Sequence, residues 1–367
     1  MAGTYRANPV ACRAVAKAPP QEEIESLLDR AAAAYEDGRW DDVLSLSRQA
    51  LAQDRKHPEA LHFEATALAE RGDLDASLAA FRRALAAVPD DADLVLGAAD
   101  VLVSRFGEDR SAVEEGLSLC KRGRALAAKR DDRELQYEFW LLEAVGLNQL
   151  GECGEALERA DRALELKAGG VDALRERAVA LFELCRFAEA EKDLQKLAAK
   201  APDDAWAQHY LGLAAERRGD GREAKRRFER ARKLDPEEFP APVTLTEEEF
   251  DRAVADAMEK LPAHVKPYLG NTTISVEHLP DEEDLTSSDP PLSPCILGVF
   301  RGTPIGERSV TSSADHFPAA IVLYQKNLER FARTRAELIE QIGITLLHEV
   351  GHLVGLDEED LWERGLE

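Results

Sequence analysis

A 34-residue period is the feature of this sequence that most restricts its fold. Turn-like stretches recur at EDGRWDD, ERGDLDA, QLGECGE, ELCRFAE and RRGDGRE, with marker positions at Gly38, Gly72, Gly151, Cys185 and Gly219. Three of the four intervals between markers are 34 residues, and the remaining one is 79. Such a period is typical of stacked helical hairpins. The long interval has room for two repeats and an insertion of about eleven residues, so we expect one degenerate repeat there.

The residues that follow each marker repeat the same order of sizes: small, bulky, small, and often proline. After Gly72 these positions hold Ser77, Phe81, Ala84 and Pro89, and after Gly219 they hold Ala224, Phe228, Ala231 and Pro236. Small residues let antiparallel helices approach, the aromatic ring fills the gap to the next hairpin, and proline ends the second helix. In the first helix of the last hairpin, Trp206, Leu211, Gly212 and Ala215 lie in helical register.

Over residues 21–236 the pattern resembles the tetratricopeptide repeat (TPR) family. The resemblance implies an all-α solenoid whose concave face binds a protein partner or a peptide. The alternative is that the array only holds or covers the segment that follows it.

A proline-rich stretch ends the repeats, because a helix cannot run through Pro236, Pro240 and Pro242. We therefore predict a linker over residues 237–245 and a second domain over residues 246–367. Thr246 and Glu249 have the spacing of a capping box, which predicts that a helix opens this domain.

The second domain is predicted to be a small α+β domain. NTTISVEHLP, PCILGVFRG and AAIVLYQ are typical of strands, whereas DEEDLTSSDPPLSP is too rich in proline and serine to be regular. Thr334 and Glu337 form a second capping box. It opens a long helix that is expected to end at Gly355.

That last helix carries the motif HEVGH. His348 and His352 lie one turn apart and share a face with Gln341 and Thr345, while the opposite face is apolar, with Ile339, Ile342, Leu346, Val350 and Leu353. Two neutral imidazoles at this spacing can bind one zinc ion, and Glu349 between them is placed to act as the general base. Zinc lowers the pKa of water and polarises a peptide carbonyl, so the motif predicts peptide hydrolysis.

A third zinc ligand is expected just beyond the helix. Glycine at 355 lets the chain turn back, and Glu358 then lies at the spacing H-E-x-x-H-x-x-G-x-x-E. Glu358 is the first candidate and Asp357 the second. The register alone does not exclude Glu359 or Asp360.

The segment from about residue 245 to 367 resembles the small bacterial zincin-like metallopeptidases. The matching stretches, in order, are LTEEEFDRAVADAMEKLP, ILGVFRGTPIGERSV, IVLYQKNL and HEVGHLVGLDEEDL. The resemblance implies zinc and peptidase chemistry. The family usually has aspartate at the third ligand position, so Glu358 departs from the pattern.

Three further polar residues are weaker candidates. Tyr324 either contacts substrate or packs in its strand, and the packing role is the more frequent one for a strand tyrosine. His316 and Arg308 lie in GERSVTSSADHF, where a surface loop is expected.

The charge and the cysteines restrict partners and compartment. The net charge is −24, and from Thr246 onward there are 10 Lys+Arg against 24 Asp+Glu, or −14. Such a surface repels nucleic acid and anionic membranes and suits cationic peptides or basic proteins. Five scattered cysteines without a C-x-x-C pair favour a reducing cytoplasm. Residues 1–20 lack the apolar core of a signal peptide and are expected to form a flexible tail.

The sequence thus predicts an all-α TPR solenoid followed by a zincin-like domain. We expect a cytoplasmic zinc metallopeptidase whose array recruits the substrate or a partner protein. The alternative is a TPR adaptor whose zincin-like domain binds metal but is catalytically inactive or latent.

Overall fold

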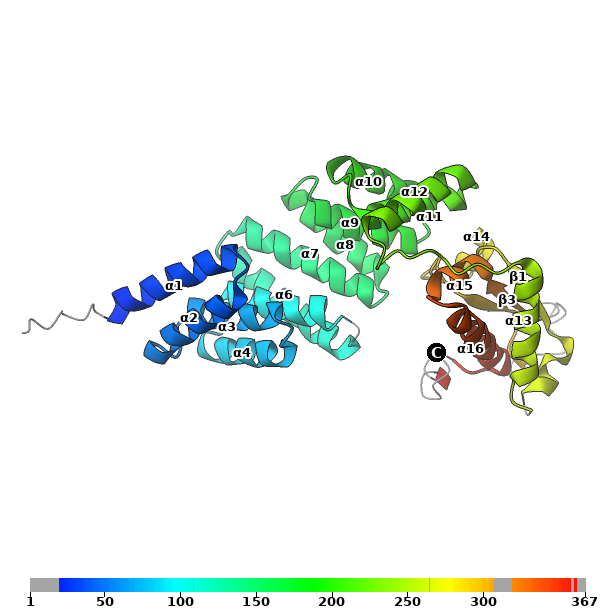
Figure 1. Ribbon diagram of the computed structural model, residues 1–367, viewed down its shortest axis with the longest axis horizontal. Coiled ribbons are helices and arrows are strands. Elements are labelled where there is room, and N and C mark those ends of the chain that lie inside the picture. Colours follow the sequence, from blue (N-terminus) through cyan, green and yellow to red (C-terminus); the bar gives the residue numbers. More distant parts are fainter. Residues whose placement is uncertain (1–19, 108, 264, 306–318, 358–359, 362–367) are drawn as a thin grey trace, which may run out of the picture. The chain divides into compact units, whose positions relative to one another are not determined.

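The computed structural model describes residues 20–107, 109–263, 265–305, 319–357 and 360–361 (Figure 1). It divides into two compact units, Met1–Leu150 and Gly151–Glu367. Both units are dominated by antiparallel helices. Across the described residues, no helix combines the length and the apolar character needed to cross a membrane.

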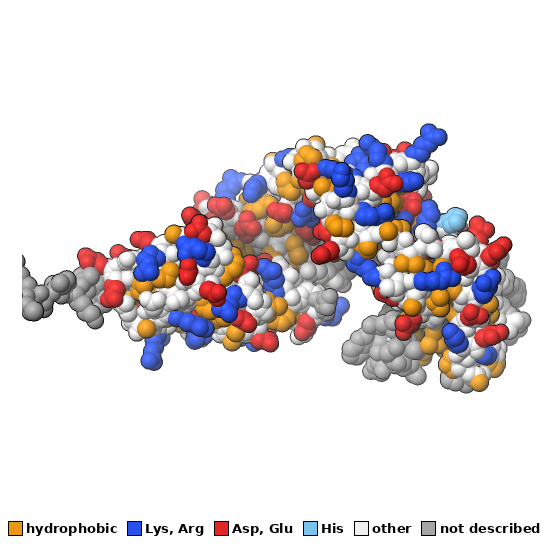
Figure 2. Space-filling view, viewed as in Figure 1, with side chains coloured by type: hydrophobic (Ala, Val, Ile, Leu, Met, Phe, Trp, Pro, Cys, Tyr) orange, Lys and Arg blue, Asp and Glu red, His pale blue; other side chains and the backbone are white. Residues whose placement is uncertain are grey.

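The first unit contains three helical hairpins and one further helix. The hairpins are α1 (Pro20–Glu36) with α2 (Trp40–Gln53), α3 (Pro58–Glu70) with α4 (Leu74–Ala87), and α5 (Ala92–Asp100) with α6 (Arg110–Lys129). The further helix is α7 (Arg133–Gln149). On the face drawn in Figure 2, acidic and basic side chains are interspersed along this unit.

The second unit begins with helices of the same kind. It contains α8 (Cys153–Leu166), α9 (Val171–Glu183), α10 (Phe187–Lys200), α11 (Ala205–Arg217) and α12 (Gly221–Leu234). Helices α9 and α10 pack on each other, as do α11 and α12. The predicted all-α repeat architecture is therefore confirmed.

Four of the marker positions, Gly38, Gly72, Cys185 and Gly219, lie in the turns inside hairpins, and Gly151 lies in the turn between α7 and α8. All five have a positive φ, at 67°, 80°, 76°, 58° and 77° for Gly38, Gly72, Gly151, Cys185 and Gly219. Glycine adopts this left-handed conformation without steric cost, whereas a side chain such as that of Cys185 disfavours it. The 34-residue period is thus the repeat of one backbone turn.

The degenerate repeat that the long interval predicts is the α5/α6 hairpin. Helix α5 continues into a π-helical turn, η1 (Val101–Arg105). Helix α6 has 20 residues, whereas α2, α4, α8, α10 and α12 have 14 each. The inserted residues therefore lengthen this hairpin.

The small and bulky residues that follow each marker have the packing roles predicted for them. Ser77 is fully buried, and its Oγ donates to the carbonyl oxygen of Ala65 at 2.8 Å. Phe81 is also buried, and it lies so close to α5 that a Cβ on Gly97 would stand 2.6 Å from its ring. The aromatic ring therefore fills the space up to the next hairpin.

Beyond residue 246 the chain forms a small α+β domain. Its helices are α13 (Glu247–Lys260), the 3-10 turn η2 (Lys266–Asn271), α14 (Glu282–Leu285), α15 (Gln325–Phe331) and α16 (Arg335–Val354). Its described strands are β1 (Thr273–Glu277), β2 (Gly298–Arg301) and β3 (Ala320–Tyr324). The strand order is β1-β3-β2, with β1 parallel and β2 antiparallel to β3.

The core of this domain lies between the sheet and helices α13 and α16. Ile321 and Leu323 of β3 pack against Phe250 of α13 and against Ile342 and Leu346 of α16. The apolar face predicted for the last helix is thus the face that holds it on the sheet. The opposite face is left for the site.

Most local predictions for this domain are confirmed. The capping box of Thr246 and Glu249 is complete. The second box is only half formed, because Thr334 caps the amide of Glu337 while the Glu337 carboxylate accepts from the Arg333 amide at 2.9 Å. The acidic stretch predicted to be irregular contains the short helix α14, and α15 is an additional helix.

The predicted domain limits stay a prediction. Between Leu234 and Glu247 the chain has no helix or strand, as expected of a linker. The division into compact units falls elsewhere, at Leu150. It therefore does not test the limits at residues 236 and 246.

Candidate metal centre

The imidazoles of His348 and His352 point at one another from successive turns of α16. Their Nε2 atoms are 3.1 Å apart, and the two rings are nearly perpendicular, at 83°. Two nitrogens bound to one tetrahedral zinc at about 2.0–2.1 Å would lie roughly 3.4 Å apart. The pair therefore fits the spacing that two zinc ligands require.

A backbone carbonyl orients the ring of His352. Its Nδ1 lies 3.0 Å from the carbonyl oxygen of Leu356, just beyond the helix. A carbonyl can only accept, so Nδ1 carries the proton in this contact. The lone pair is then on Nε2, the nitrogen that faces His348, which is the arrangement usual for a metal ligand.

Glu349, the residue that follows His348 in α16, is buried, with 5% of its surface exposed. Strand β2 approaches it closely at Gly298, where a Cβ would stand 3.2 Å from Glu349 Cγ and 2.8 Å from Thr345 Cγ2. The absence of a side chain at Gly298 makes room for the glutamate beside the histidine pair.

These side chains open into a cleft of about 670 Å³. One wall is α16, with Gln341, Thr345, His348, Glu349 and His352. The facing wall is apolar and consists of Leu292, Ile296, Leu297, Gly298, Val299 and Phe300. Among the described lining residues none is Lys or Arg.

The chain turns back beyond the helix as predicted. Gly355 has φ +95°, and the amide of Leu356 donates to the carbonyl of Gly351 at 3.0 Å. Asp357 lines the cleft, and its Oδ1 accepts from the Asp360 amide at 2.9 Å. The first candidate, Glu358, lies outside the described residues, as does Glu359. The third ligand therefore stays a prediction.

The structure gives Tyr324 a packing role. The ring is fully buried at the end of β3, its hydroxyl donates to Asp284 Oδ2 at 2.5 Å, and it does not line the cleft. Burial, and then the bond to Asp284, raise the pKa of Tyr324. His316 and Arg308 lie outside the described residues.

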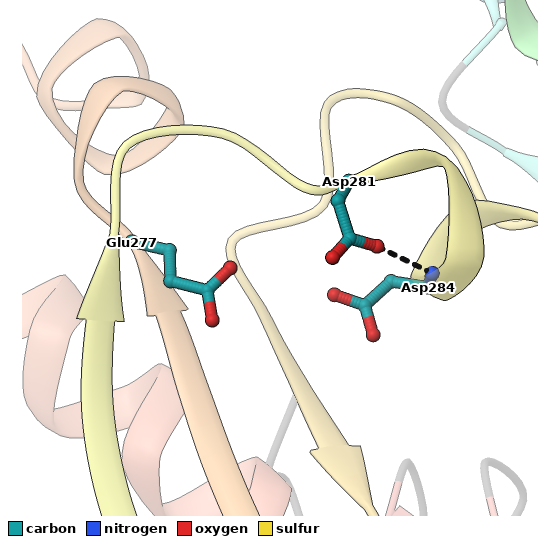
Figure 3. Close-up of side chains that lie close together, drawn as sticks. All are labelled: Glu277, Asp281 and Asp284. Carbon is teal, nitrogen blue, oxygen red and sulfur yellow. Dashed lines mark hydrogen bonds between the residues drawn. The ribbon is translucent and has the colours of Figure 1, made fainter.

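A second group of acidic side chains, which sequence reasoning missed, lies at the far end of β1. Ligand oxygens of Glu277, Asp281 and Asp284 are within 4.8 Å of one another (Figure 3). Arg301 donates to both Glu277 and Asp284, and Asp281 caps α14 through the Asp284 amide at 2.8 Å. Burial alone would raise the pKa of Asp284, but the bonds from Arg301 and Tyr324 outweigh it and lower the pKa.

A cation is thus already present among these carboxylates. Because Arg301 supplies the charge that a metal ion would supply, we interpret the group as an ion-pair network. It holds α14 to the sheet. No local motif marks it, since its members come from four separate elements.

In the comparison with known families, the repeat region and the C-terminal region match different family models. The model described as zincin-like metallopeptidase matches residues 269–366, and models of the tetratricopeptide repeat match residues 34–99 and 141–205. The chain joins tetratricopeptide repeats to a zincin-like metallopeptidase domain. The histidine pair and the cleft both lie within the zincin-like domain.

Solved structures similar to this chain are TPR proteins. PilF of Pseudomonas aeruginosa is 14% identical, with a TM-score of 0.51 over 65% of this chain and 99% of its own. PilW, a type IV pilus biogenesis factor, is 16% identical, with a TM-score of 0.52 over 62% and 97%. At such identities the likeness shows the fold alone. Among proteins of curated function, none matches the chain significantly.

Proposed function

We propose that this protein is a zinc-dependent peptidase whose TPR array recruits a substrate or partner protein. The observation that carries the proposal is the facing pair of Nε2 atoms, 3.1 Å apart, in a cleft whose lining also includes the buried Glu349. His348 and His352 would hold the zinc, together with one carboxylate from residues 357–360, of which Glu358 is our first choice.

The bound zinc would lower the pKa of water and polarise the peptide carbonyl. Glu349 would take a proton from the water as its oxygen bonds to the carbonyl carbon, and would pass that proton to the leaving nitrogen as the C–N bond breaks, which gives one new carboxyl end and one new amino end. His352 keeps its orientation through the carbonyl of Leu356. The apolar wall opposite α16 excludes bulk water from the scissile bond.

The cleft also favours an extended substrate. Strand β2 lies at the edge of the described sheet, and its residues Gly298, Val299 and Phe300 line the cleft. An extended backbone can lie along such a strand, as in other strand-addition complexes. We propose that the scissile bond is held there, facing Glu349.

The array supplies the second half of the proposal. Stacked TPR hairpins form a surface on which peptides and proteins bind, and this surface would deliver a protein substrate or anchor the enzyme. We place the protein in the reducing cytoplasm. In support, the cysteines of the described part, Cys120, Cys153, Cys185 and Cys295, are all free.

Replacing Glu349 with glutamine tests the chemistry. The amide keeps the shape of the side chain but cannot accept the proton. We expect Glu349→Gln to keep about one zinc per chain while cleavage of a casein or peptide-library substrate falls by roughly 10²–10⁴-fold. His348→Ala should instead lose the zinc.

Glu340→Gln is the matched control, because Glu340 is an exposed residue of the same helix and does not line the cleft. It should keep both zinc and activity. A wild-type protein that binds zinc and cleaves nothing would support the adaptor alternative. A wild-type protein without zinc would overturn the proposal.

A further inference from the structure

The apolar wall of the cleft ends in a segment that is held from outside the zincin-like domain. Residues 292–297, here called the wall segment, precede β2 and contribute Leu292, Ile296 and Leu297 to the cleft. The segment has no helix or strand of its own. Its position therefore depends on the groups that bind its backbone.

Two TPR helices supply such groups. Arg217, the last residue of α11, donates to the carbonyl of Pro294 at 3.0 Å and to that of Pro280 at 2.9 Å. Burial raises the pKa of Glu183, the last residue of α9, and the nearby hydroxyl of Ser293 opposes that rise. The Cys185 thiol, in the turn that follows, lies 3.7 Å from the carbonyl oxygen of Leu292.

Arg217 is unusual in having neutral partners. Within the described part of the chain its guanidinium forms no ion pair with a carboxylate, and it lies 5.0 Å above the ring of Phe187. Burial lowers the pKa of Arg217, as expected when a charge leaves water for neutral carbonyls. The Arg217 side chain thus binds the carbonyl of Pro294, in the wall segment, and that of Pro280.

The zincin-like domain binds the same segment from the other side. Asn327 of α15 donates to the carbonyls of Pro294 at 3.0 Å and Ile296 at 2.8 Å. Helix α15 is in turn fixed to α11, because Glu216 pairs with both Lys326 and Arg330. Figure 1 shows α11 and α15 near one another. One turn of α11 therefore holds both the segment and the helix that braces it.

We infer that Arg217 of the TPR array is a positioning residue for the cleft, and that the last TPR hairpins complete the substrate-binding wall. The inference rests on the proposed peptidase function. Arg217 touches neither the histidines nor Glu349. It acts through Pro294, whose neighbours line the cleft, so a ligand of the array that moves α11 would change substrate binding.

Arg217→Met in the full-length protein tests this inference, because methionine keeps the apolar stem and removes the donors. The amides of Ser293, Cys295, Ile296 and Leu297 should exchange hydrogen about tenfold faster or more. The KM for a peptide should rise about tenfold, with kcat changed by less than about twofold, because the wall segment would contact the substrate away from the scissile bond, which we place along β2. Zinc content should stay unchanged.

Arg218→Met is the matched control. Arg218 is the next residue, is exposed, and pairs with Glu191 inside the array. It should alter neither exchange nor KM. Arg217→Lys, which keeps the charge and a donor, should recover part of the lost protection.

Asn327→Leu releases the carbonyls of Pro294 and Ile296 from the domain side and should therefore also speed exchange. If Asn327→Leu loosens the wall segment while Arg217→Met leaves exchange at the wild-type rate, the array does not position the wall and the inference is overturned. Exchange is measured without turnover, so an inactive protein would overturn the peptidase proposal while leaving this test intact.

Discussion

At the scale of single residues, the site depends on how closely β2 approaches α16. Gly298 faces Thr345 and Glu349 at distances that leave no space for a side chain. Glu349 can therefore be buried while it lines the same cleft as both histidines. A larger residue in β2 would push the helix or the glutamate away.

Gly298→Ala should accordingly reduce both stability and activity. The added Cβ would stand 2.8 Å from Thr345 Cγ2 and 3.1 Å from the carbonyl oxygen of Val322, which is backbone and cannot move freely. We expect a loss of about 1–3 kcal/mol in the free energy of unfolding, measured by denaturant titration. The kcat should fall because Glu349 is displaced.

Gly270→Ala is the control for this substitution, since a Cβ at Gly270 would meet nothing within 4 Å. Its stability and kcat should match the wild type. Equal behaviour of the two variants would show that the contact between β2 and α16 does not set the position of Glu349.

His209 should make the protein sensitive to acid. The ring stacks on Phe239 with centroids 4.6 Å apart, and burial, with a smaller effect of Arg330, lowers its pKa from 6.5 to about 4. The unfolded chain then binds the proton first, so stability is fully present above pH 6.5 and is lost as the pH falls toward 4. The loss is at most about 3 kcal/mol.

Phenylalanine at this position keeps a ring for Phe239 and cannot titrate. The free energy of unfolding of His209→Phe should therefore fall less steeply than that of the wild type between pH 6.5 and 4. His278→Phe removes an exposed histidine instead and should follow the wild-type curve. Parallel curves for all three proteins would contradict a buried neutral His209.

The sequence predicts some of these residues and not others, for a physical reason. His348, His352 and Glu349 lie within five positions on one helix, so helical spacing alone brings them together. Arg217 lies 77 positions before Pro294 and binds a carbonyl, which every residue type possesses. Such a contact leaves no pattern in the sequence.

At the scale of elements, the position of the site depends on how α16 packs on the sheet and on where the helix ends. Its apolar face is buried against the sheet, and its last turn closes through the left-handed Gly355. The turn also brings the carbonyl of Leu356 to His352 and leads to the acidic residues that follow. The end of this helix is therefore part of the proposed metal site.

Gly355→Ala should weaken zinc binding although Gly355 is not a ligand. At φ +95° a Cβ is strained, which should cost about 1 kcal/mol of stability. The shift in Leu356 would loosen His352, and loss of such support typically lowers metal affinity about 10–100-fold. Competition with a chromophoric chelator measures the affinity.

Gly343→Ala on the same helix is the matched variant. A Cβ there would be 3.9 Å from Ala257 Cβ, an ordinary contact, and alanine is the better helix former by about 1 kcal/mol. It should stabilise the protein and leave zinc affinity unchanged. A Gly355→Ala protein with wild-type affinity would show that the helix end does not support the site.

Elements with their own start and stop signals were predictable, and α15 was not. Helix α16 has a threonine cap at one end and a glycine at the other, and the regular repeats have their marker turns. Helix α15 is only seven residues long and follows β3 directly, with Tyr324 making no side-chain cap bond. The strand order also escapes prediction, because β3 pairs between two strands that precede it in sequence.

At the scale of the whole molecule, the excess of acidic residues bears on the charge of the substrate. The chain has a net charge of −24, and the residues from Thr246 onward account for −14 of it. Of these acidic residues, Glu349 and Asp357 line the cleft, and the described lining contains no Lys or Arg. We propose that this field attracts basic segments toward the cleft and repels acidic ones.

Ionic strength separates this attraction from contact within the cleft. Screening acts over about 30 Å at 0.01 M salt and about 3 Å at 1 M, so only long-range attraction should disappear between the two. The kcat/KM for a peptide with flanking lysines should therefore fall at least about tenfold, whereas the same peptide with glutamines should change less than about twofold. If both peptides lost activity equally, salt would be acting on the enzyme itself, and the acidic surface would have no part in choosing the substrate.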